Sequence, residues 1–185
     1  MTLMSTMARV REIFFSGSHE FRGDLESIQE IAFLLDKQFL FLKEISIATK
    51  AAYHAILDDV LKNKHAHDLA DGGEKNHIAL KILAGEHLKK HGFRVQYEHP
   101  FCGYYPDVLA HDASIVVECG HTQNPEKMLA YFRQGAIKKC IQIPYPVSEN
   151  DEICGYIFTA SEHLVGFLDA LERKKLQELR AHYGK

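Results

Sequence analysis

The sequence lacks the long apolar runs and the strong charge imbalance that mark several protein classes. No apolar run approaches the roughly 20 residues that a transmembrane helix needs. The first residues, MTLMSTMARVR, have no apolar core of the kind that a signal peptide carries. Lys and Arg total 22 against 25 Asp and Glu. The resulting net charge of -3 excludes a polybasic coat for nucleic acid, although a local basic patch remains compatible with it.

Cysteine is also sparse, and its spacing excludes two kinds of small domain. The sequence contains four cysteines, and no two of them form a CxxC pair. This pattern is typical of reduced thiols rather than of a disulfide framework or a zinc knuckle. Together with the absence of a membrane segment and of a signal peptide from the sequence, this cysteine pattern predicts a soluble protein of the cytoplasm.

The chain has the composition of a folded protein. Its 185 residues are 46% apolar and 25% charged, which suits one domain or one domain with an extension. The pattern changes near residue 70, from purely helical to mixed helix and strand. We therefore expect an N-terminal helical extension over residues 1–70, for packing or dimerisation, and an α/β domain over residues 71–185.

Two helices are expected in the extension. Asp24 can cap a first helix over residues 25–44, and a second helix is expected over residues 47–62. The first helix has an apolar stripe, and Phe33, Leu34, Leu40 and Phe41 widen it beyond what one neighbouring element would cover. The two helices either pack on their own domain or form the surface of a homodimer. The stripe consists of Ile28, Ile31, Ala32, Leu35, Phe39 and Leu42.

The α/β domain is expected to follow the order α-β-β-β-α-β-(β)-α around a mixed sheet. Its first helix should run over residues 74–90 and stop at Gly92. Asn124 and Pro125 begin the second helix, and Gly135 ends it. Ser161 should cap a last helix that runs to about residue 182. The expected strands are residues 93–99, 104–110, 114–118, 140–145 and 152–160.

The most informative feature is a pair of acids on two neighbouring strands. If residues 111–114 form a four-residue hairpin loop, Asp107 lies directly opposite Glu118, on the same face. Like charges in that position destabilise a sheet unless a proton, a basic partner or a cation compensates. Two carboxylates with a backbone carbonyl are hard oxygen ligands that suit Mg2+ or Mn2+. The alternative is that both acids are solvated on an edge hairpin, but the apolar run SIVVE indicates an inner strand.

These motifs resemble the PD-(D/E)xK nuclease superfamily, which has the restriction-endonuclease-like fold. The similarity covers residues 73–145 and includes GGEKNHIALKILA, HGFRV, YYPDVLA and VVECG in that order. The resemblance implies a metal-dependent nuclease acting on DNA more often than on RNA. It also implies a site in which Asp107 and Glu118 hold the metal, with the Cys119 backbone carbonyl as a further ligand. Glu74 would complete the shell, directly or through water.

One position departs from the family pattern. The family usually places Lys two residues after the second acid, and this chain has Gly120 there. Lys127, near the start of the following helix, is the best local replacement, and the free N–H groups of that helix start can bind a phosphate. If Lys127 is instead an ordinary surface lysine, the domain is a catalytically silent module that binds nucleic acid or protein. A small-molecule metallohydrolase on the same acid pair is a third possibility.

Further residues are candidates for binding nucleic acid. His77, one helical turn from Glu74, can also meet the site, but a structural role is the alternative for a lone helix histidine. For the others the alternatives are plain loop, surface or packing roles. The candidates are His121 and Gln123 after the Glu-Cys-Gly turn, Lys138 and Lys139 in a basic cluster, and Tyr105, whose ring can stack on a base.

Overall fold

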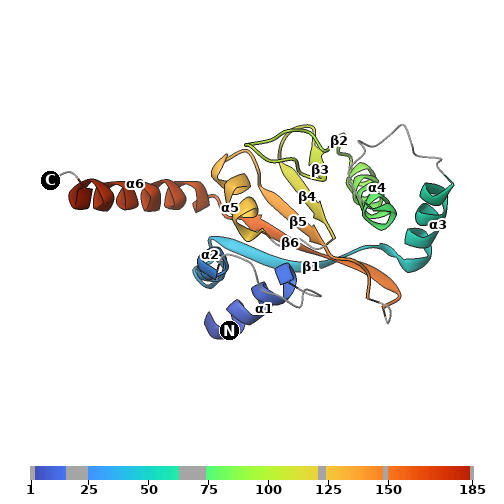
Figure 1. Cartoon of the computed structure of the whole chain (residues 1–185), viewed down its shortest axis with the longest axis horizontal. Helices are drawn as coiled ribbons and strands as arrows, with labels where there is room; N and C mark the ends of the chain where they lie inside the picture. The colour runs from blue at the N-terminus through green and yellow to red at the C-terminus, as the bar shows by residue number, and fades with distance from the viewer. Residues whose placement is uncertain (1–2, 16–24, 63–73, 121–123, 148–149, 184–185) are drawn as a thin grey trace.

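The computed structural model describes residues 3–15, 25–62, 74–120, 124–147 and 150–183. These residues form an α/β protein with one open, mixed six-stranded sheet in the order β1-β6-β5-β4-β3-β2 (Figure 1). Strands β4 and β5 are parallel, and the other neighbours are antiparallel. The strands are β1 (Leu40–Thr49), β2 (Val95–Tyr97), β3 (Val108–Ala110), β4 (Ile115–Cys119), β5 (Lys139–Ile143) and β6 (Glu152–Ala160). The helices are α1 (Leu3–Phe15), α2 (Leu25–Asp36), α3 (Lys50–Leu61), α4 (Lys75–Lys90), α5 (Pro125–Arg133) and α6 (Leu164–Tyr183).

The order predicted after residue 70 is confirmed, because α4, β2, β3, β4, α5, β5, β6 and α6 follow one another along the chain. Helix α5 begins as its sequence indicates: the Asn124 side chain accepts a hydrogen bond of 3.0 Å from the Lys127 N–H, and Pro125 fills the first turn. Ser161 does not cap α6 with its side chain. That helix begins only at Leu164, and the buried Ser161 hydroxyl has no partner.

The prediction for the N-terminal segment is wrong in one respect. The expected helix over residues 25–44 ends at Asp36, and Gln38 adopts a left-handed φ of 60°. Residues 40–49 then form β1, which pairs with β6 and closes one edge of the sheet. An unpaired strand edge on β6 offers this apolar stretch a ladder of backbone hydrogen bonds, so tertiary pairing overrides the helical spacing. The segment 1–70 is therefore not purely helical.

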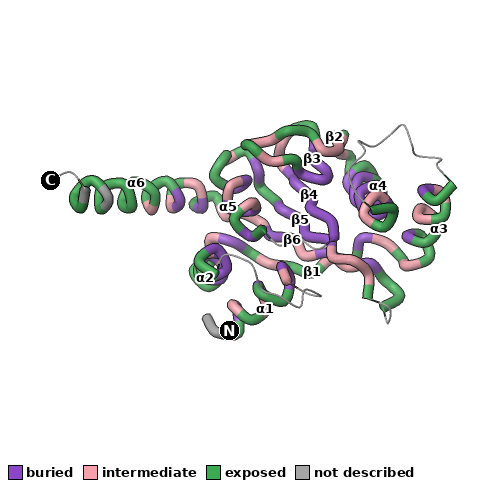
Figure 2. The backbone as a smooth tube through the Cα atoms, viewed as in Figure 1, coloured by how far each residue is buried: buried purple, intermediate pink, exposed green. Residues whose placement is uncertain are grey.

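Helices cover both faces of the sheet. On one face α1, α2, α5 and the start of α6 pack around Tyr131, Phe132 and Phe158. On the other face α3 and α4 pack around Leu80 and Ile141. The central strands β4 and β5 are buried almost throughout (Figure 2). None of the helices in the described part of the chain is long and apolar enough to cross a membrane.

Candidate active site at the ends of the central strands

The hairpin of β3 and β4 brings the two acids together. Val108 pairs with Val117 and Leu109 pairs with Val116, which is the register predicted for the four-residue loop. In the loop, the Asp112 carboxylate accepts hydrogen bonds from the Ser114 N–H at 3.1 Å and the Ser114 hydroxyl at 2.7 Å. The same register, continued by one residue, places Asp107 opposite Glu118.

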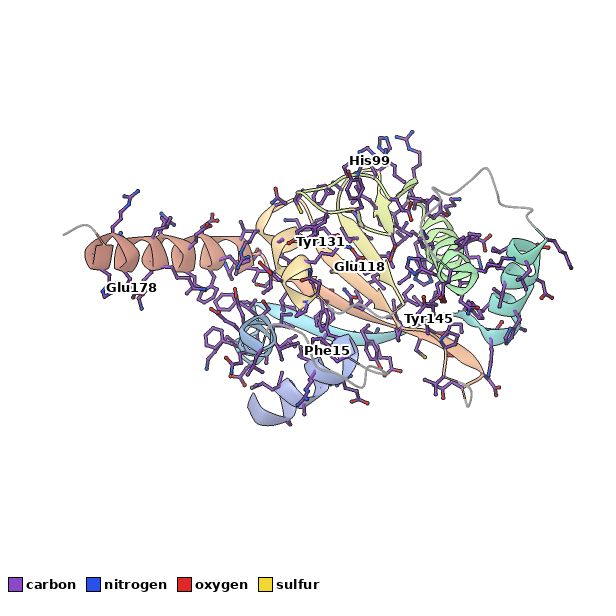
Figure 3. All side chains as sticks on the ribbon, viewed as in Figure 1. Phe15, His99, Glu118, Tyr131, Tyr145 and Glu178 are labelled. Atoms are coloured by element: carbon purple, nitrogen blue, oxygen red, sulfur yellow. The ribbon has the colours of Figure 1, made fainter. Side chains whose placement is uncertain are left out.

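Glu118 is buried against α5, with only 5% of its surface exposed. Lys127 Nζ donates to its Oε2 at 2.8 Å. The Tyr131 hydroxyl donates to its Oε1 at 2.7 Å, and Figure 3 labels both Glu118 and Tyr131. Burial raises the pKa of Glu118 to about 7, and the negative charge of Asp107 adds to that rise. The Lys127 ammonium and the two hydrogen bonds act in the opposite direction. Burial thus dominates, and it favours the neutral form of this carboxyl.

Asp107 is buried as well, but its partners come from elsewhere. Its Oδ1 lies 3.0 Å from Nε2 of His77 on α4, and its Oδ2 accepts a hydrogen bond of 2.7 Å from the Cys119 N–H. The partners of Glu118 come from α5, on the opposite face. The two carboxylates are therefore neighbours at the end of the sheet, but they are not held by groups from one face.

The structure explains the glycine at the position where the family carries lysine. Gly120 has a φ of +80°, which side chains rarely adopt, and a Cβ there would lie 2.9 Å from the ring of Tyr145. A lysine at position 120 would therefore adopt a strained backbone conformation, and the ring of Tyr145 would have to move. Lys127 instead brings a cation to the pair, and its Nζ also lies 3.4 Å from the carbonyl oxygen of Tyr105.

Several of the other predicted residues lie beside the pair. Glu74 is exposed at the N-cap of α4; its charge and that of Asp107 add to the effect of burial in raising the pKa of Tyr145. Cys119 contacts Asp107 through its N–H, and a role for its carbonyl stays a prediction. Tyr105 is 65% exposed, and its backbone carbonyl oxygen is the atom that lies near Lys127.

Two predicted basic residues are not brought to the pair. Lys139 pairs with Ile115 at the start of β5, whereas Glu118 pairs with Gln142 near the end of that strand. Lys138 is turned to the carbonyl oxygen of Gly135, 2.9 Å away. Both lysines therefore lie at the opposite end of β5 from the acids, although they are close to them in sequence. His121 and Gln123 lie outside the described residues.

The structure adds side chains that the sequence did not single out as part of the site. Lys81 is fully buried one turn after His77 and forms an ion pair with Glu98, whose N–H donates to the Asp107 carbonyl at 3.3 Å. His77 and Lys81 are four residues apart and therefore share one face of α4, but this spacing points to neither partner. Tyr131, one turn after Lys127, shares a face of α5 with it in the same way.

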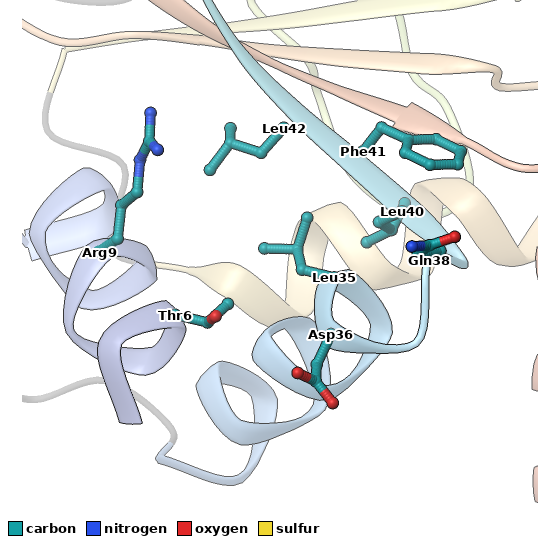
Figure 4. A pocket seen from close by; sticks show the side chains of 8 residues that line it. All are labelled: Thr6, Arg9, Leu35, Asp36, Gln38, Leu40, Phe41 and Leu42. Carbon is teal, nitrogen blue, oxygen red and sulfur yellow. The ribbon is translucent and has the colours of Figure 1, made fainter. Parts of the chain in front are cut away.

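The pair is not a complete metal centre by itself. Within residues 3–15, 25–62, 74–120, 124–147 and 150–183, no three His, Cys, Asp or Glu side chains are grouped so that they could hold an ion. A cavity of about 290 Å3 lies elsewhere, between α1, α2 and β1 (Figure 4). It is lined by Thr6, Arg9, Leu35, Asp36, Gln38, Leu40, Phe41 and Leu42, and neither acid contributes to it.

Comparison with known proteins returns no match to a family model, to a curated protein sequence or to a solved structure. The resemblance to the PD-(D/E)xK nucleases therefore stays a prediction. The geometry of the acid pair and its surroundings is what bears on function.

Proposed function

We propose that this protein is a divalent-metal-dependent nuclease that hydrolyses phosphodiester bonds, in DNA rather than RNA, at Asp107 and Glu118. The observation that carries the proposal is the burial of two opposed carboxylates at the ends of adjacent inner strands, with the Lys127 ammonium beside them. Two buried, opposed carboxylates lower the stability of the fold, so their presence calls for a function that needs them. The order of motifs around it, which resembles that of the PD-(D/E)xK nucleases, supports the same reaction.

The chemistry of the donor set fits Mg2+ or Mn2+. Each of the four carboxylate oxygens has one hydrogen-bond partner, and an ionised carboxylate has about four lone-pair sites. Mg2+ usually binds through one or two carboxylates and takes its remaining ligands from water and substrate phosphates. Asp107 and Glu118 would hold the cation, and water and substrate oxygens would fill positions that the two carboxylates leave open.

The cation, when bound, would lower the pKa of a water molecule and neutralise charge on the scissile phosphate. The chain's own groups would do the rest. His77 and the Cys119 N–H fix the orientation of Asp107. Lys127 is placed to stabilise the extra negative charge of the transition state. The exposed ring of Tyr105 offers a surface on which a base can stack.

A second candidate is a catalytically silent module of the same fold that binds nucleic acid or protein. The observations that favour it are Gly120 at the usual lysine position and the ion pair of Lys127 with Glu118. A lysine engaged in this way neutralises one acid of the pair, which is one of the compensations that a buried carboxylate needs.

Cleavage of labelled single- and double-stranded DNA and RNA, with Mg2+, Mn2+ or EDTA, tests the proposal. Wild type should cut only with a divalent metal, and Asp107→Asn and Glu118→Gln should abolish cutting. Lys127→Ala should lower the rate by about 100- to 1000-fold, the usual loss for one charge-stabilising group. Asp169→Asn, on the exposed surface of α6, is the matched control and should cut like wild type.

Two results would contradict the nuclease. Cutting that survives in both acid variants would show a contaminating enzyme. Metal binding without cleavage of any of the four substrates would favour the silent module. That second result would contradict catalysis but not the metal site, so the two parts of the proposal are tested separately.

A further inference from the structure

A glutamine on the third strand lies beside the acid pair. Gln142 of β5 pairs in parallel register with Glu118 of β4. Paired residues of neighbouring strands project from the same face, and their strands are about 4.8 Å apart. The Gln142 side chain is therefore adjacent to that of Glu118, and only 3% of it is exposed.

Only one end of the Gln142 side-chain amide has a hydrogen-bond partner. Its Nε2 contacts the Cys140 sulfur at 3.5 Å, whereas its Oε1 is buried with no hydrogen-bond partner. In the described part of the chain, only the Ser161 hydroxyl shares this condition. A buried acceptor without a donor costs free energy, and a bound ion or a catalytic role is one of the reasons for which folded proteins keep such a group.

An oxygen ligand on this neighbouring strand is what the acid pair lacks. Asp107 and Glu118 contribute oxygens from β3 and β4, and no third His, Cys, Asp or Glu completes a group in the described residues. An amide carbonyl is a hard oxygen ligand of the kind that Mg2+ and Mn2+ accept beside carboxylates. It also adds no negative charge to a place that already holds two acids.

We infer that Gln142 supplies its amide oxygen to the coordination shell of the divalent cation that Asp107 and Glu118 hold, either directly or through one water ligand. The inference rests on the proposed function, since it assumes the metal site. It makes the site a three-strand site, formed by the ends of β3, β4 and β5 together.

Metal binding without any substrate tests the inference. Titration of Mg2+ by calorimetry, with Mn2+ followed by electron paramagnetic resonance, would compare wild type with Gln142→Leu. Loss of a partner in the shell should weaken binding by about 10- to 100-fold. The melting temperature in EDTA should stay equal or rise, because the substitution removes an unpartnered buried acceptor. The stabilisation that added metal gives to the fold should shrink in parallel.

Two further variants complete the test. Gln142→Glu keeps an oxygen at the end of the side chain and should bind the metal at least as tightly as wild type. Ser161→Ala removes the other unpartnered buried group, which is in the loop after β6, and should leave binding unchanged. Should Gln142→Leu fail to fold, Gln142→Asn withdraws the oxygen by one methylene and should show the same weakening.

The outcomes separate this inference from the proposed function. Unchanged affinity in Gln142→Leu or Gln142→Asn, with binding lost in Asp107→Asn, overturns the role of Gln142 and leaves the metal site intact. No metal binding by wild type overturns both. Weakened binding in the leucine variant and retained binding in the glutamate variant support the role of the amide oxygen.

Discussion

Two neighbouring rows of residues cross the same face of the sheet, and they differ sharply. The first row is apolar and packs under α1, α2 and α5; its members are Leu42, Phe158, Cys140, Val116 and Leu109. The second row, two residues further along each strand, is polar; its members are Glu44, Tyr156, Gln142, Glu118 and Asp107. The same strands thus contribute apolar side chains to the core and, two residues further along, polar side chains to the second row.

The two rows differ in what their burial contributes to the stability of the fold. The apolar row buries side chains that need no partner, and Phe158 and Val116 are fully buried. The polar row buries Asp107, Glu118 and Gln142 nearly as deeply, so each needs hydrogen bonds or a ligand to offset its lost hydration. Polar groups retained at such depth indicate a functional site at this level of the sheet.

The largest expected effect lies in the apolar row. Phe158→Ala should lower the free energy of unfolding by about 3–5 kcal/mol, because it leaves a cavity in a closely packed core. Urea denaturation measures the loss. Phe41→Ala, on the neighbouring edge strand β1 and 51% exposed, should change it by less than about 1 kcal/mol. Equal losses in the two variants would refute the assignment of this row as core.

In the polar row, Glu118 should make stability depend on pH. Its pKa is about 7 in the folded chain and should be near 4.5 in the unfolded chain, so the folded state binds the proton more tightly. Stability in EDTA should therefore fall as the pH rises from 4.5 to 7 and level off above that. Glu118→Gln should abolish this pH-dependent loss of stability, which is on the order of 3 kcal/mol.

Unfolding in urea at pH 5 and pH 8 tests this expectation. Other titrating groups are common to both proteins and cancel when the variant is subtracted from wild type. Glu178→Gln, an exposed acid on α6, is the control and should leave the dependence unchanged. Parallel curves for wild type and Glu118→Gln would show that Glu118 has an ordinary pKa.

The smallest of these effects concerns the turn beside the polar row. Gly120 and Gly103 have similar left-handed φ values of +80° and +85°, but only Gly120 has a neighbour, Tyr145, in the space of a Cβ. Both glycine-to-alanine variants should lose about 1–2 kcal/mol to backbone strain. Gly120→Ala should lose about 1 kcal/mol more, because Tyr145 must move. Equal losses, measured by urea denaturation, would mean that Tyr145 gives way without cost.

Much of the site could be predicted because it depends on local pattern. The register of the β3–β4 hairpin follows from a four-residue loop, so it places Asp107 opposite Glu118. The cap and the proline of α5 fix where that helix begins, which is why Lys127 was a sound prediction for a residue near Glu118. Closeness in sequence did not place Lys138 and Lys139 beside the pair, since it says little about which end of a strand a residue occupies. Their role in binding nucleic acid stays a prediction.

The element order after residue 70, the β3–β4 hairpin and the start of α5 could be read from the sequence alone, because short-range sterics and hydrogen bonds decide them. Only the tertiary structure decided that residues 40–49 form a strand, that His77 meets Asp107 and that Gln142 lies beside Glu118. These contacts join segments far apart in the chain. Their free energy comes from pairing and burial that exist only once the sheet is assembled, so no local pattern encodes them.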